Sequence, residues 1–261
     1  MNGKDKDWFL PVSIGAGVLL VAGGLGLYWL RDNGPAPEPT ETEAPVHDPF
    51  ATTTAPPPVD TAPTQSALPL PPLDESDSDV LGGLTELFGQ DAVKRFLVPE
   101  RIVRNIVVSI DNVPRQQMAF NQRPITPTPG ALVTAGADDT LVLAPENYAR
   151  YEPFVALVRA TDAKTLVSLY RGLQPLFQQS YEELGNPSKS FNERLIEVIE
   201  HLLATPNVRD EIRLVQPSVL YRYADERLEN LSAGQKLLIR MGPENAAIIK
   251  AKLRELQAEL V

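Results

Sequence analysis

The feature that most limits how this chain folds is a stretch of 23 residues without a charged side chain, residues 8–30. As a helix it would be about 34 Å long at about 1.5 Å per residue, and the hydrocarbon core of a bilayer is about 30 Å thick. Trp8, Tyr28 and Trp29 lie at its ends, where amphipathic rings favour the headgroup region. Residues 28–32 lack the small side chains of a cleavage site. We therefore expect one transmembrane helix, kept as a signal anchor.

The Lys and Arg residues around this segment predict its orientation. Lys4 and Lys6 precede it, and after Arg31 the next Lys or Arg is Lys94. Because cytoplasmic flanks carry the excess of Lys and Arg, residues 1–7 are expected in the cytoplasm. In a bacterium with two membranes, the chain would then be a single-pass inner-membrane protein with its C-terminal part in the periplasm.

Residues 31–72 are predicted to form a proline-rich, acidic linker. Residues 33–72 hold 12 of the 25 prolines and five Asp and Glu residues. Too few apolar side chains are present to offset the entropy of ordering, and proline favours an extended chain. We expect a disordered spacer that holds residues 73–261 away from the bilayer.

The composition excludes several kinds of function. The chain has no cysteine, which removes disulfides, thiol nucleophiles and Cys-ligated zinc. Its formal net charge is −10 and it has no cluster of Lys and Arg, so a nucleic acid is not an expected partner.

Residues 73–261 are predicted to form one globular domain, in which apolar residues recur with a helical period. Ser190 with Glu193, and Ser232 with Gln235, have the spacing of capping boxes that begin two of the helices. Helices are expected over residues 80–88, 91–97, 102–110, 145–158, 166–184, 191–203, 237–241 and 243–260.

Extended structure is expected in two short places only. Residues 132–143 have the pattern of a hairpin, and residues 212–223, interrupted by Pro217, that of one or two edge strands. Residues 112–130, with four prolines, are predicted to be an irregular loop. The fold class that follows is α+β, predominantly α-helical with a small antiparallel sheet.

Several short motifs resemble those of one bacterial family. They are residues 68–77, 111–112, 147–151, 191–192, 199–203, 217–218, 221–223 and 241–245. Over about residues 68–261 the chain is similar to the domain of unknown function 3014 (DUF3014). The resemblance implies one N-terminal span, a proline-rich acidic stalk and this C-terminal domain, and it transfers no catalytic residue.

Catalytic chemistry has little support in the sequence. His201 is the only histidine in residues 73–261, and no nucleophile elbow accompanies a serine. We interpret His201 as a helix-face residue that donates to a carbonyl. Glu197 lies four residues before it, but no third metal ligand accompanies the pair. We expect no catalytic residue, no cofactor and no metal site.

Carboxylates are the one catalytic possibility left, because a glycosidase needs only two of them. Turn chemistry and solvated helix faces also explain each candidate without catalysis. The candidates are Asp138, Asp139, Glu182, Glu183, Glu193 and Glu197.

Two segments are candidates for a contact with a partner. On an edge strand, Tyr221 and Tyr223 would share one face and Arg222 would lie on the other, and Tyr and Arg are enriched at interfaces. Residues 241–245 join two helices, which a Gly stop followed by Pro and Glu explains structurally. The functional alternative there is a small anion site. Its residues would be Arg240, Glu244 and Asn245.

The leading functional hypothesis is a non-catalytic envelope module that binds a protein or cell-wall partner at a distance set by the linker. The alternative is an envelope hydrolase that cleaves peptidoglycan through carboxylates. The two differ in whether wall fragments are released.

Overall fold

The computed structural model of the protein describes residues 70–116, 122–126, 131–217 and 220–261. The predicted span, residues 8–30, and residues 31–69 of the predicted linker lie outside the described residues. Within the described part, no helix combines the length and the apolar character that crossing a bilayer requires.

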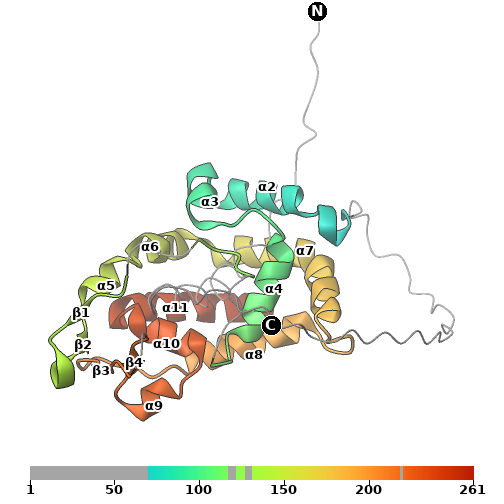
Figure 1. Ribbon diagram of the computed structural model, residues 1–261. Coiled ribbons are helices and arrows are strands. Elements are labelled where there is room, and N and C mark those ends of the chain that lie inside the picture. Colours follow the sequence, from blue (N-terminus) through green and yellow to red (C-terminus); the bar gives the residue numbers. More distant parts are fainter. Residues whose placement is uncertain (1–69, 117–121, 127–130, 218–219) are drawn as a thin grey trace, which may run out of the picture. The chain divides into compact units, whose positions relative to one another are not determined.

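Helices make up most of the described part (Figure 1). Their residue ranges agree closely with the helical periods of the sequence, with two exceptions given below. They are α2 (Asp77–Phe88), α3 (Gln90–Phe96), α4 (Ile102–Asn112), α5 (Glu146–Ala149), α6 (Glu152–Ala160), α7 (Ala163–Glu183), α8 (Phe191–Leu203), α9 (Glu226–Glu229), α10 (Ala233–Arg240) and α11 (Pro243–Leu260).

Two small antiparallel hairpins confirm the predicted strands. The pairs are β1 (Thr134–Ala135) with β2 (Val142–Leu143), and β3 (Leu214–Val215) with β4 (Arg222–Tyr223). A bridge between Val142 and Arg213 joins the hairpins, which gather with α5 and α9 at one end of the domain (Figure 1). The fold class is therefore α+β and predominantly helical, as predicted.

The last helix, α11, is central to the packing. It runs through the middle of the domain and contacts α6, α7, α8 and α10 (Figure 1). Ile249, Leu253 and Leu256 recur on one face of this helix and are fully buried. This spacing places one apolar stripe against the neighbouring helices.

Helix α10 is buried along its whole length, from Ala233 to Arg240. It lies between two apolar clusters. Leu237 and Leu238 belong to the main helical core, and Ile239 packs with Tyr223 in a smaller cluster under the hairpins. One short helix therefore joins the two cores.

The predicted helix starts are confirmed by their caps. Ser232 and Gln235 form both halves of the capping box that begins α10. The Ser190 side chain accepts a hydrogen bond from the backbone N–H of Glu193 at 3.3 Å and begins α8. These side chains satisfy N–H groups that have no partner within the helix.

One helix prediction is wrong. Residues 145–158 form two helices, α5 and α6, rather than one. The break falls at Arg150 and Tyr151, just before Pro153 in the first turn of α6. Proline has no N–H to donate to the preceding turn but fits the start of a new helix, so the second helix begins there.

Two elements have no counterpart among the predictions. Within the predicted irregular loop 112–130, Ile125 pairs with Leu97 in an isolated bridge, and the side chain of Ile125 is buried. The short helix α9 follows Asp225, whose side chain accepts from the backbone N–H of Arg227 at 2.9 Å. Four residues are too few to show a helical period in the sequence.

The turn between α10 and α11 depends on glycine. Gly242 has a φ of +84°, and a Cβ added there would lie 2.6 Å from the ring of Tyr148. Asn245 completes this contact, because its side-chain amide donates to the carbonyls of Tyr148 at 3.0 Å and Met241 at 2.9 Å.

Gly242→Ala is therefore expected to lower the free energy of unfolding by about 2 kcal/mol or more, since it adds both backbone strain and a clash. Gly172→Ala in α7 is the control, because its added Cβ meets nothing within 4 Å, and it should raise stability by about 0.4–1 kcal/mol. Urea unfolding followed by circular dichroism measures both changes. Equal stability of the two variants would contradict this account of the turn.

Candidate functional site

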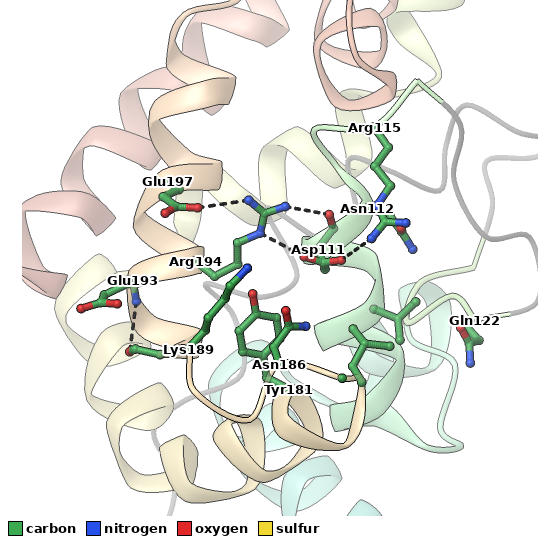
Figure 2. A pocket seen from close by; sticks show the side chains of 14 residues that line it. Asp111, Asn112, Arg115, Gln122, Tyr181, Asn186, Lys189, Glu193, Arg194 and Glu197 are labelled. Carbon is green, nitrogen blue, oxygen red and sulfur yellow. Dashed lines mark hydrogen bonds and ion pairs between the residues drawn. The ribbon is translucent and has the colours of Figure 1, made fainter.

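A polar pocket of about 920 Å³ opens where the end of α4, the loop between α7 and α8, and the start of α8 meet (Figure 2). Charged and amide side chains from all three elements surround it. Those used below are Asp111, Arg115, Tyr181, Lys189, Arg194 and Glu197.

The centre of the pocket is an ion pair between α4 and α8. Nε of Arg194 donates to Oδ1 of Asp111 at 3.1 Å, and a second nitrogen donates to the Asp111 carbonyl at 3.1 Å. The third bond of this guanidinium goes to Glu197 at 3.1 Å, and Arg115 binds the other carboxylate oxygen of Asp111 at 2.7 Å. Figure 2 shows the resulting network of two cations and two anions.

Local structure holds Arg194 in place. It lies in the first turns of α8, which the Ser190 cap begins, and Phe191 beside it is fully buried. The Gln178 side chain of α7 accepts from the Phe191 backbone N–H at 2.8 Å. Asp111 lies in the last turn of α4, where the helix dipole disfavours a negative charge, so the two guanidiniums stabilise it there.

Tyr181 forms part of the pocket floor. Its side chain is 2% exposed and packs edge-on against the Phe191 ring at a centroid distance of 5.5 Å. Burial, and next the charge of Asp111, raise the pKa of Tyr181. The phenol is therefore protonated at neutral pH and offers a hydrogen-bond donor rather than a nucleophile.

His201 lies one turn beyond the pocket network on α8. Its Nε2 lies 2.8 Å from the hydroxyl of Ser232, so its partner is a hydroxyl and not the carbonyl that the sequence suggested. The His201 backbone carbonyl accepts from the Gln235 side chain at 3.1 Å. His201 thus ties α8 to the cap of α10, whose serine is already engaged in the capping box.

The carboxylates proposed from the sequence are spread over the domain. Glu183 pairs with Arg104, and Glu197 pairs with Arg194. The side chain of Glu193 is exposed, and Glu193 lines the pocket together with Glu197 (Figure 2). Among the described residues, no group of three or more His, Asp and Glu side chains could hold a metal ion.

The six residues predicted to contact a partner lie at different depths. Tyr223 and Arg240 are each 4% exposed, and the Arg240 guanidinium lies over the Tyr223 ring at 5.8 Å. Arg222 and Glu244 are exposed, while Tyr221 and Asn245 are half-buried. The expected alternation across β4 is confirmed, and partner binding by these residues stays a prediction.

The family comparison matches the part of the chain that builds this pocket. The family described as protein of unknown function (DUF3014) matches residues 102–257, well over half of the chain. The chain belongs to this family. Neither a curated protein nor a solved structure matches it. The DUF3014 match runs from α4 to α11 and so includes both partners of the Asp111–Arg194 pair, while residues 68–77 of the resemblance precede it.

Sequence reasoning missed the pocket, because Asp111 and Arg194 are 83 residues apart. Arg194 does not depart from its local pattern. The one available signal was Asp111 itself, a carboxylate at the end of a helix whose buried residues are mostly apolar.

The His201 contact predicts a pH dependence of stability. Burial, with a contribution from the charge of Arg194, lowers the pKa of His201 below its ordinary value of 6.5. The unfolded chain then binds the proton more readily, so the free energy of unfolding falls as pH drops below about 6.5. We expect the melting temperature to fall between pH 7.5 and about 5, and to fall less in His201→Gln. Circular dichroism melts test this, and parallel pH profiles would refute it.

Proposed function

We propose that this DUF3014 protein is a non-catalytic envelope module that binds a partner in the pocket between α4 and α8. Residues 8–30 anchor it in the inner membrane with residues 1–7 in the cytoplasm, and residues 31–72 space the domain, residues 73–261, from the bilayer. The partner is a protein or a component of the cell wall.

The observation that carries this proposal is the ion-pair network of the pocket. Both oxygens of the Asp111 carboxylate accept from guanidiniums, and Arg194 in turn binds Glu197. Charges that bond to one another form a fixed polar surface, whereas a catalytic acid or base needs a pKa shifted towards its task. The arrangement supports recognition over turnover.

Three carboxyl groups are poorly suited to the hydrolase alternative. A glycosidase needs one carboxyl group with a raised pKa as its general acid. Hydrogen bonds lower the pKa of Asp162, Glu183 and Asp225. None of these three groups lines the pocket.

Crosslinking in cells tests the binding role. A photoreactive residue at Asn112, which lines the pocket, is expected to capture a defined partner, while one at Gln90, exposed on α3, should not. The yields are compared by gel shift and mass spectrometry. Equal capture from the two positions would show that the pocket is not the binding site.

Incubation with purified peptidoglycan separates the two functional hypotheses. The full chain in detergent is expected to release no soluble fragments, as scored by chromatography of the supernatant. Release that is lost in Glu193→Gln or Glu197→Gln would favour the hydrolase instead. Sedimentation with the wall, without release, would identify the wall as the partner.

A reporter fusion tests the orientation. A phosphatase that is active only outside the cytoplasm, fused after Val261, is expected to be active, because Lys4 and Lys6 keep the N-terminus inside. The same fusion without residues 8–30 should be inactive. Activity of a cytoplasmic reporter at Val261 would reverse the orientation.

A further inference from the structure

The charges that line the pocket balance one another. Three cations and three anions surround it, namely Arg115, Lys189, Arg194, Asp111, Glu193 and Glu197. A charged ligand would therefore meet no net charge of the opposite sign, whereas a neutral polar ligand leaves the balance unchanged. The pocket favours a ligand that is polar and carries no net charge.

One buried polar group is aimed into this pocket without a partner. Tyr181 is 2% exposed, and among the described residues its hydroxyl makes no hydrogen bond. The hydroxyl points towards the Asp111–Arg194 pair (Figure 2), and the charge of Asp111 adds to the effect of burial in raising its pKa. Buried side-chain polar groups nearly always have a partner. We therefore expect the partner of this hydroxyl to be whatever occupies the pocket.

Five further side chains of the lining leave their polar groups open. Among the described residues, none of the five side chains forms a hydrogen bond or an ion pair. They are Asn112, Gln122, Asn186, Lys189 and Glu193. The three amides both donate and accept, the ammonium donates and the carboxylate accepts. A ligand that satisfies this mixture must itself both donate and accept.

Hydroxyl groups meet this requirement, because a single oxygen both donates and accepts. A sugar carries several of them in a small volume. Apolar surface is scarce in the lining, where Leu184 is 41% exposed and Val108 only 8%. Such a surface suits the C–H face of a sugar ring, whereas a bound peptide places its side chains in pockets. The volume, about 920 Å³, lies within the range of small-ligand pockets, about 300–1,000 Å³.

We infer that the ligand of this pocket is a short neutral oligosaccharide, one oxygen of which accepts a hydrogen bond from the Tyr181 hydroxyl. This inference rests on the binding role proposed above and names its ligand class. Two sources share the chemistry, namely the N-acetylated glycan of the cell wall and an envelope glucan without acetamido groups.

Calorimetric titration of the full chain, in a detergent without a sugar headgroup, measures the binding. The probes are chitotetraose, built from N-acetylglucosamine, and cellotetraose, built from glucose. We expect binding with a Kd that changes less than about twofold between about 0.05 and 0.5 M NaCl, because salt screens attraction between charges and a neutral ligand has none. Preference for chitotetraose points to the wall glycan, and preference for cellotetraose to a glucan.

Two tyrosines of α7 provide matched variants. Tyr181→Phe removes only the hydroxyl that faces the pocket and is expected to raise the Kd about tenfold. Tyr170→Phe is the control, because Tyr170 is 1% exposed, does not line the pocket, and has a hydroxyl without a partner in the described part. Its Kd should stay unchanged. Both variants keep the aromatic ring, and circular dichroism confirms that they are folded.

The outcomes separate the two proposals. Equal effects of the two substitutions, or a Kd that rises steeply with salt, would overturn the oligosaccharide site. If neither sugar binds, the ligand class is wrong, and the binding role stands where Asn112 still captures a partner in cells. If a sugar binds through Tyr181 while Asn112 captures nothing and the chain does not sediment with peptidoglycan, the ligand class stands and the cellular role is wrong. Cleavage of the bound sugar, scored by chromatography, would keep the ligand class and overturn the non-catalytic role.

Discussion

Burying positive charge in two adjacent helices is the constraint on which the rest of this domain depends. The buried cations are Lys236 and Arg240 on α10, and Lys250 and Lys252 on α11. Taking a charge out of water costs several kcal/mol unless its donors are satisfied. The ammonium of Lys252 donates to the Thr161 carbonyl at the end of α6 at 2.7 Å, and that of Lys250 to the Thr205 carbonyl just beyond α8. Each lysine therefore supplies a partner at a helix C-terminus, where a positive charge is favoured.

The same constraint gives the pocket a fixed wall. Helix α8 is held at its C-terminal end by Lys250, at its start by the Ser190 cap, and in between by His201. Arg194 projects from this helix and cannot move far without breaking its bonds to Asp111. By contrast, Arg115 and Lys189 stand at the exposed rim. The Asp111–Arg194 pair is already fixed before a ligand binds. Only the exposed side chains of Arg115 and Lys189 would therefore lose much conformational entropy on binding.

Local sequence signals predicted the helices and strands well, because the backbone groups of each helix or hairpin form their hydrogen bonds within that element. The Ser232 cap and the alternation of Tyr221 to Tyr223 are such signals, and both are confirmed. The single helix expected over residues 145–158 is wrong, because the apolar residues keep a helical period through this segment while Pro153 starts a new helix. The pocket could not be predicted, because it depends on how α4 packs against α8, and no pattern within either helix encodes that contact.

The motifs that carry the family resemblance divide into two kinds once the structure is considered. Tyr148 and Gly242 are in van der Waals contact, and the Asn245 side chain donates a hydrogen bond to the Tyr148 carbonyl, so packing accounts for these three motif residues. Packing does not account for Asp111. A carboxylate at a helix C-terminus opposes the helix dipole, requires two guanidiniums to stabilise it, and adds nothing to the apolar core around it. In natural proteins, the positions that break such local rules are expected to be functional or strained sites. In this domain, that position lies at the edge of the polar pocket between α4 and α8.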